Sequence, residues 1–401
     1  MPLIVFEQRF YTGFVILSVL SCLSYSIIPG GVAVATYVIP ITSYFLLFVT
    51  WKEVFFYQRD KEIDCRQIVW LLLFWNICII ARGLWDASDY WDYRGLILSR
   101  IPALLLPIVI FIGGSMGLMA RIYSALLKIY IPLSLLIIKP IFYQVIGVPL
   151  LFIVPYIPFL ARRWYKYLFV VFLLLAINLS ARAWTLRLAV AIILLCVYRF
   201  RKKDFSLFFY RILFCIMVAT PLLFVILGYT GRFNILNMDS YLESNTDKIP
   251  TIDTRSHLYR LVEKKLTEED KNWYGLGGIS EYWEGFYADY KYSDNKGFSQ
   301  KGRDSTEAGL LNMYLYGGFI GAILYSLLYI SAAYKAFFSS CNFASKLLGL
   351  FVLFRWIISF IDEPESRTVS MIILYLTIGL CLSRQFRRMS DTDFKTRLNV
   401  I

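Results

Sequence analysis

The stretch YLFVVFLLLAINLSARAWTLRLAVAIILLCVY, residues 167–198, contains two apolar runs separated by a short polar break that carries Arg182 and Arg187. Each run approaches the length that a helix needs to cross the hydrocarbon core of a bilayer. A charge at bilayer depth costs about 2.5–3.5 kcal/mol on insertion scales, so it normally faces a partner or a wet cavity. The stretch therefore predicts two membrane helices with an anionic ligand held near the turn between them.

The rest of the chain repeats this apolar pattern. Of its 401 residues, 58% are hydrophobic, and the mean hydropathy is +0.60. Repeated apolar runs of membrane-spanning length predict an all-α polytopic membrane protein with about twelve transmembrane helices. These spans are expected near residues 10–28, 32–50, 67–84, 97–119, 122–138, 141–160, 167–181, 185–198, 208–228, 308–333, 347–361 and 369–382.

Prolines interrupt the middle of the chain at positions 132, 140, 149, 155 and 158. Broken helices are tolerated in a membrane where protein or water covers the freed backbone groups. The prolines therefore indicate either simple kinks or a cavity for a bulky amphiphile.

The charge distribution predicts the topology. The whole chain has a net charge of +13. Residues 229–307 hold 11 Lys/Arg and 14 Asp/Glu, so the rest of the chain holds 30 basic and 14 acidic residues. This excess lies in short alternate turns between spans, which places both termini in the cytoplasm and is not a nucleic-acid-binding pattern. Three parts follow: membrane helices in 1–228, one large extracytoplasmic loop at 229–307, and membrane helices with a basic cytoplasmic tail in 308–401.

Several classes of site have little support. None of the seven cysteines lies in the large loop, and no CxxC pair is present. His257 is the single histidine, so it is a weak catalytic candidate and multi-histidine metal sites are disfavoured. Asp86, Asp89 and Asp92 could bind a cation, although a solvated loop is the simpler interpretation. We expect neither a metal nor a cofactor.

The large loop contains a segment, residues 253–263, that is typical of an amphipathic helix. Its apolar positions Leu258, Leu261, Val262 and Leu266 fall on one stripe, and it carries Arg255 and Arg260. Such a helix could lie on the membrane rim with its arginines near lipid headgroups.

Further charged residues flank the last spans. Arg303, Asp304 and Glu307 stand just before the span at 308–333. Glu307 is either a helix cap or a general base that accepts a proton from an attacking hydroxyl, with Asp304 as the fallback. Arg355 lies inside a span and either pairs with Asp362 and Glu363 or points into a cavity.

The outer-face arginines indicate what kind of ligand is bound. Guanidinium groups bind phosphate oxygens in bidentate fashion and stay charged at any working pH, so a gathering of them fits a pyrophosphate. Interfacial arginines also commonly meet lipid phosphates without binding a specific ligand. We expect Arg182, Arg187, Arg255, Arg260 and Arg303 to hold the pyrophosphate.

The order of the motifs resembles the O-antigen polymerase (Wzy) and O-antigen ligase superfamily over roughly residues 167–325. Three elements of the family carry the resemblance: a Ser-Arg element at the outer end of a middle span, an arginine-bearing loop helix followed by a Gly-x-Gly turn, and an acidic or His position before a span with a Gly-x-x-Gly end. Here these are Ser180-Ala181-Arg182, Arg255 to Arg260 with Gly275-Leu276-Gly277-Gly278, and Glu307 with Gly317-Gly318-Phe319-Ile320-Gly321. This chain departs from the first element by one extra residue, Ala181. Ligases carry a His-Asn pair where this chain has Glu307, which favours a polymerase.

The resemblance implies a metal-independent glycosyltransferase of the GT-C type in a bacterial inner membrane. It would join undecaprenyl-diphosphate-linked oligosaccharide repeat units into a surface polysaccharide, such as O-antigen, capsule or exopolysaccharide. Membrane lipids, a flippase and a chain-length regulator are the further partners it suggests. A flippase or transporter of the same lipid-linked oligosaccharide, and an O-antigen ligase, remain the alternatives.

Overall fold

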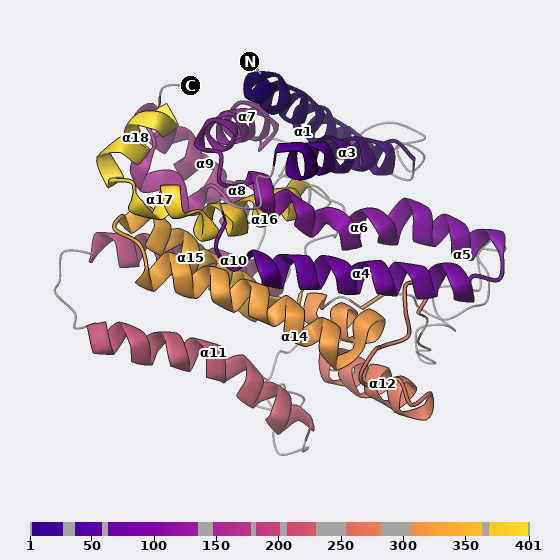
Figure 1. Cartoon of the computed structure of the whole chain (residues 1–401). Coiled ribbons are helices and arrows are strands. Elements are labelled where there is room, and N and C mark those ends of the chain that lie inside the picture. Colours follow the sequence, from indigo (N-terminus) through magenta and orange to yellow (C-terminus); the bar gives the residue numbers. More distant parts are fainter. Residues whose placement is uncertain are drawn as a thin grey trace.

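The chain folds as a bundle of helices in the computed structural model (Figure 1). The structure describes residues 2–26, 37–57, 63–134, 147–177, 182–200, 207–229, 254–280, 282, 305–306, 308–362 and 369–399. Within these ranges the secondary structure is helical and no β-strand forms; Ile63 and Ser383 make one isolated antiparallel bridge.

Five helical segments of the described chain are long and apolar enough to cross a membrane, which agrees with an all-α membrane protein. They are α3 (Ile39–Tyr57), α4 (Arg66–Asp86), the segment Tyr90–Ile112, α7 (Met116–Leu133) and α14 (Gly309–Phe338). Two shorter apolar stretches are Arg211–Leu223, within α11 (Leu207–Tyr229), and α16 (Val369–Leu382). The other helices are α1 (Pro2–Ser26), α9 (Arg163–Ile177), α10 (Arg182–Arg199), α12 (Thr254–Glu268), α15 (Phe343–Ile358), α17 (Arg384–Arg388) and α18 (Asp391–Asn399).

The segment Tyr90–Ile112 is not one regular helix. It passes through α5 (Tyr90–Gly95), a π-helical turn (η3, Leu96–Arg100), α6 (Ile101–Leu105) and a 3-10 helix (η4, Leu106–Ile112). The expected span at 97–119 is therefore wrong at its end, because the chain turns at Gly113-Gly114-Ser115 and Ser115 caps α7 by accepting a hydrogen bond from the amide of Leu118. Arg121, which falls between the expected spans at 97–119 and 122–138, lies inside α7.

The expected span at 141–160 is also interrupted. Its described part consists of α8 (Val148–Leu151) and a 3-10 helix, η8 (Val154–Phe159), with prolines at 149, 155 and 158. Most of these residues are buried, so protein covers the backbone groups that the prolines leave without partners.

Small residues allow the closest helix contacts. A Cβ atom at Gly379 of α16 would overlap with the carbonyl oxygen of Ile110 in η4, and one at Gly113 would overlap with that of Leu376. Gly349 of α15 faces Ala333 and Ala336 of α14 in the same way. Such contacts are typical of membrane helices, whose association depends on close packing because lipid is itself apolar.

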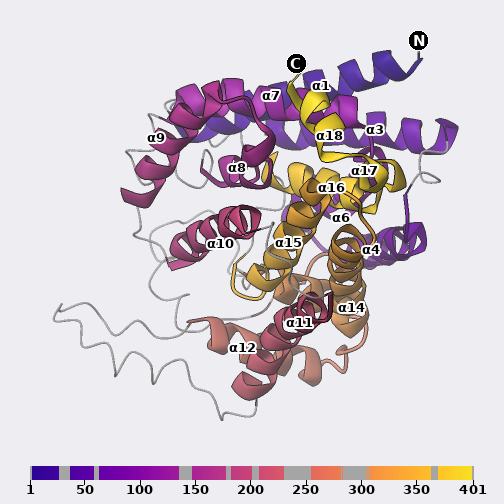
Figure 2. The ribbon, with the colours of Figure 1, turned by 90° about the vertical axis from the view of Figure 1, so that its left-hand side faces the viewer.

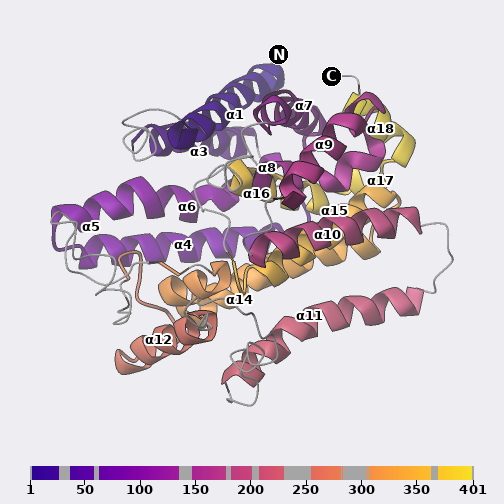
Figure 3. The same ribbon diagram turned by 180° about the vertical axis from the view of Figure 1, so that it is seen from behind.

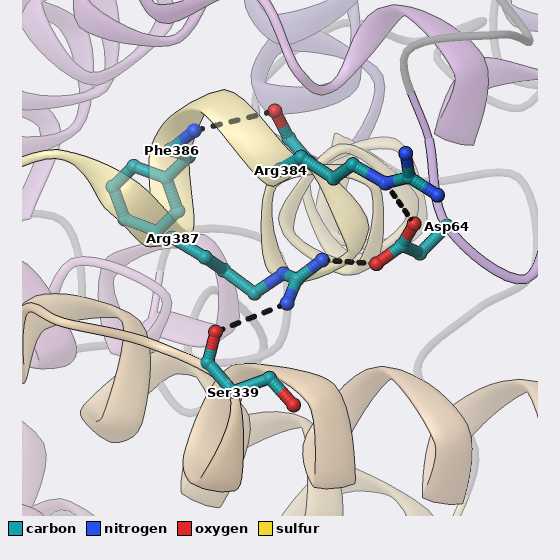
Figure 4. Close-up of polar contacts among 6 residues, drawn as sticks. Asp64, Ser339, Arg384, Phe386 and Arg387 are labelled. Atoms are coloured by element: carbon teal, nitrogen blue, oxygen red, sulfur yellow. Dashed lines mark hydrogen bonds and ion pairs between the residues drawn. The ribbon is translucent and has the colours of Figure 1, made fainter.

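One end of the bundle gathers three turns that are distant in sequence (Figure 4). Asp64 accepts hydrogen bonds from both Arg384 and Arg387, and Arg387 also donates to the carbonyl oxygen of Ser339 at 3.1 Å. Asn342 donates to the carbonyl oxygen of Phe386 at 2.7 Å. Residues 63–65, 339–342 and 383–389 therefore contact one another. The charge pattern assigns all three segments to one side of the membrane.

Candidate functional site

The site begins with an ion pair between Arg187 of α10 and Asp362, which follows α15. Arg187 donates a hydrogen bond to the Asp362 carboxylate, and the two side chains are 7% and 15% exposed. Figure 2 shows α10 alongside α15. Two charges removed from water in this way require each other, because an unpaired ion in an apolar environment is strongly disfavoured. The sequence singled out Arg187 but did not identify its carboxylate, which lies 175 positions away.

Arg355 lies on the same side of α15 as this pair. It is 5% exposed, its Nε atom has no hydrogen-bond partner, and it forms no ion pair with any described residue. Its guanidinium carbon lies 5.7 Å from the ring centroid of Phe152, within the range of a cation–π contact. Of the two expected partners of Arg355, Asp362 pairs with Arg187 instead, and Glu363 lies outside the described residues.

Arg355 and Arg187 face a common narrow pocket. The rest of its lining is apolar and comes from α8, η8, α10 and α15, and includes Leu151, Phe152, Val190, Leu194 and Phe351. The proline-interrupted segment thus forms one wall of this narrow pocket, which has a volume of about 10 Å³. A cavity for a bulky amphiphile stays a prediction. An anion in such a pocket would lose its water and would depend on the guanidinium groups for compensation.

The predicted amphipathic helix is confirmed as α12, but its apolar stripe is not free to enter the membrane. Leu258, Val262 and Leu266 are buried in a cluster with residues of α4 and α14. Tyr259 donates a hydrogen bond to the carbonyl oxygen of Phe360 at 2.9 Å. The helix therefore packs through this stripe on the protein and bonds to the end of α15; Figure 3 shows it beside the beginning of α14. A position at the membrane rim stays a prediction.

The structure describes the side chain of only one of the three candidate arginines on α12 and at the start of α10. Arg260 is exposed on α12. The backbones of Arg255 and His257 lie in the first turns of α12, and that of Arg182 begins α10, while their side chains lie outside the part of the chain that the structure describes.

The residues before α14 form a compact hydrogen-bonded turn. Asn312 accepts from the amide of Thr306 at 2.6 Å and from its hydroxyl at 2.8 Å, and donates to the Thr306 carbonyl at 3.1 Å. The N-cap position of α14 is Ala308. The candidates Arg303, Asp304 and Glu307 lie outside the described residues, although Thr306 and Ala308 fix the chain on both sides of position 307.

Three of the segments identified from the sequence meet at the C-terminal end of α15. Within four consecutive residues, Ser359 accepts a hydrogen bond from the amide of Leu310 at 2.9 Å, Phe360 accepts one from Tyr259, and Asp362 pairs with Arg187. The start of α14, the helix α12 and the first turns of α10 are therefore held to one short stretch of chain.

The glycine turn at 275–278 has a structural role. The amides of Leu276 and Gly277 donate to the carbonyl oxygens of Leu315 and Tyr316, and that of Gly278 donates to Ile79. These amides are consequently occupied, which removes the basis for a phosphate loop. Gly275 and Gly277 have φ of 73° and 92°, which favours glycine at both positions.

Arg82 holds this turn and was missed by sequence reasoning. Its guanidinium donates to the carbonyl oxygens of Gly275 at 2.9 Å and Tyr274 at 2.6 Å, and it lies 5.8 Å from the ring centroid of Trp75. The signal was available, because Arg82 is an arginine within an expected span. A charge there requires a partner, and backbone carbonyl oxygens provide it.

The acidic residues at 86–92 do not indicate a cation site. Asp89 accepts from the amide of Asp92 at 2.9 Å, and the Asp92 carboxylate accepts from the amide of Asp89, so the pair caps α5. Across the described ranges, no group of three or more His, Cys, Asp or Glu side chains is placed to hold a metal ion.

No protein-family model, no curated protein and no solved structure matches the chain. The geometry at the end of α15 is therefore the main basis on which its chemistry can be inferred.

Proposed function

We propose that the chain is a polymerase that joins undecaprenyl-diphosphate-linked oligosaccharide repeat units at the outer face of a bacterial inner membrane. In this proposal it is a metal-independent glycosyltransferase of the GT-C type with about twelve spans and both termini in the cytoplasm. The observation that carries it is the convergence of α10, α12 and the start of α14 on residues 359–362, where two arginines lie buried.

The reaction assigns distinct roles to the converging segments. A hydroxyl of the acceptor repeat unit attacks the anomeric carbon of the donor glycan, whose bond to the diphosphate oxygen breaks. Glu307 accepts the hydroxyl proton, and undecaprenyl diphosphate leaves with the bonding electron pair. Arg182, Arg187, Arg255, Arg260 and Arg303 stabilise the charge that develops on the leaving group, an effect worth about 3–4 kcal/mol for one well-placed donor in other enzymes.

The start of α14 supports the position of the base. Thr306 and Ala308 are fixed by hydrogen bonds on either side of position 307, and Leu310 is bonded to Ser359. The described start of α14 is therefore held to Ser359, three residues before Asp362. Positioned general-base catalysis typically contributes about 10²–10⁴-fold to a rate.

The test uses purified full-length protein, lipid-linked repeat unit and no ion gradient. Longer glycan products are expected from the unmodified protein, and Glu307→Gln is expected to abolish them while leaving the single repeat unit intact. Glu268→Gln is the matched control, because Glu268 is an exposed carboxylate on α12. Normal chain length in Glu307→Gln would remove that residue from the mechanism.

A second variant tests the donor site. Arg182→Ala is expected to weaken binding of the lipid diphosphate, whereas Arg199→Ala, at the other end of α10, is expected to leave it unchanged. Absence of polymer together with gradient-driven movement of the lipid-linked unit would instead identify a transporter.

A further inference from the structure

Arg355 of α15 is a buried cation. It is 5% exposed, its Nε atom has no partner, and its guanidinium forms no ion pair with any described residue. Burying a charge in this way is costly unless something compensates it. A protein that retains such a group therefore provides a place for an anion that is not part of its own helices.

The cluster around Asp64 shows how this chain satisfies two arginines with one carboxylate. There, Asp64 accepts hydrogen bonds from both Arg384 and Arg387. At the outer-loop end of α15, Asp362 accepts one from Arg187 and none from Arg355. Among the described residues, the second arrangement leaves Arg355 without an ion pair and its Nε atom without a hydrogen-bond partner.

The pocket between the two arginines has a volume of about 10 Å³, so a diphosphate that enters it must displace side chains, and Asp362 lies outside its lining. Arg187 and Arg355 belong to α10 and α15, whereas Asp362 follows the end of α15, where its amide donates to the carbonyl oxygen of Ile358 at 2.9 Å. Rotation of the Asp362 side chain would break its ion pair with Arg187. The remaining lining is apolar, so it suits an anion attached to a hydrocarbon chain.

We propose that Arg187 and Arg355 together form the binding site for the diphosphate of a polyprenyl ester, and that Asp362 pairs with Arg187 as an internal counter-ion until the diphosphate displaces it. This inference rests on the proposed function and adds two elements to it: Arg355 as a second diphosphate ligand, and Asp362 as a competitor for the site.

The competition predicts opposite effects for two variants. Asp362→Asn removes the competing charge with little change in shape. If the locked form makes up about nine-tenths of the protein, the Kd for the diphosphate falls about tenfold. Arg355→Gln removes a charged donor, which is expected to raise the Kd about 10- to 100-fold. In the double variant, the tighter binding due to Asp362→Asn is expected to disappear.

Farnesyl diphosphate is the probe, with inorganic pyrophosphate measured in parallel, and binding is titrated to the full chain in lipid nanodiscs. Glu268→Gln controls for the loss of one negative charge elsewhere on the protein. The Tm without ligand is a second measurement: Arg355→Gln is expected to keep or raise it, because the variant removes an uncompensated buried charge. A marked fall in Tm would show that Arg355 is a structural residue and would overturn the proposal.

The outcomes separate this inference from the proposed function. Unchanged or weaker farnesyl diphosphate binding in Asp362→Asn would overturn the proposal that Asp362 competes with the diphosphate. Unchanged binding in Arg355→Gln would overturn Arg355 as a diphosphate ligand. Polymer formation by the same preparations would leave the proposed function standing in either case. The predicted shifts in Kd without polymer formation would support the site and contradict the polymerase. Equal affinity for inorganic pyrophosphate would overturn the assignment to a polyprenyl ester.

Discussion

We expect Asp64, which lies between α3 and α4, to stabilise the protein by holding α17 through two ion pairs. Its carboxylate accepts hydrogen bonds from Arg384 and Arg387, and the three side chains are 13%, 69% and 6% exposed, respectively (Figure 4). The two arginines therefore make the same kind of contact in very different surroundings. This contrast permits a test in which one carboxylate variant is compared with one arginine variant.

The expected losses of unfolding free energy depend on how exposed each arginine side chain is. Asp64→Asn leaves Arg387 buried without its counter-ion, and breaking a buried pair by removing one partner costs about 3–5 kcal/mol of unfolding free energy. Arg384→Gln breaks a pair whose cation is largely in water, so the expected loss is below about 1 kcal/mol. The Asp64 variant is thus expected to be several times more destabilising than the Arg384 variant.

The pH dependence provides an independent check. Burial raises the pKa of Asp64, but hydrogen bonds and charge from Arg384 and Arg387 outweigh this effect and hold the pKa below its ordinary value of 3.8. A carboxylate whose pKa is lowered by folding contributes stability that is fully present above the unfolded pKa and is lost as the pH falls through the folded pKa. The difference between the parent protein and Asp64→Asn is therefore expected to be constant near neutral pH and to shrink below about pH 4.

The assay is unfolding of the purified full chain in detergent micelles. Unfolding is monitored by the reaction of a thiol reagent with Cys381, which is buried in the folded protein. Arg387→Gln belongs in the same series, because it removes the buried cation while leaving Asp64 with Arg384. Equal losses in Asp64→Asn and Arg384→Gln, or a difference that persists unchanged at pH 3, would refute the reasoning.

Three further substitutions test the packing. Gly379→Ala is expected to destabilise the protein by about 1–3 kcal/mol because the new methyl group would overlap with the carbonyl oxygen of Ile110, whereas Gly95→Ala, with nothing within 4 Å of its Cβ, is expected to be neutral or stabilising; thermal unfolding of both checks this. Leu258→Ala is expected to cost about 2–5 kcal/mol and to release α12, which would appear as faster hydrogen exchange confined to residues 254–268. Arg82→Gln is expected to expose the glycine turn to limited proteolysis at 273–278, and unchanged cleavage there would show that the Arg82 contacts do not hold the turn.

The candidate site was predictable only in its components. The sequence identified Arg187 and Arg355 because an arginine within an apolar run requires an explanation wherever it occurs. It could not rank Arg182 against Arg187 as a ligand or choose between partners for Arg355. Those choices depend on Asp362, which approaches α10 only after α15 has packed against it. Arg82 shows the same limitation, since its partners are backbone oxygens near residues 274 and 275.

The sequence by itself determined that this is a helical membrane protein and where many of its helices lie, because hydrophobicity and its periodicity are properties of consecutive residues. It also determined the amphipathic stripe of α12, since the spacing of Leu258, Val262 and Leu266 is local. Only the tertiary structure decided that this stripe packs on protein, that the helix boundary falls at Gly113-Gly114-Ser115, and that Asp362 pairs with Arg187 rather than with Arg355. Each of these outcomes depends on which distant segments come into contact, and the free energy of a buried charge or an apolar face is set by those neighbours rather than by the residues beside it in the chain.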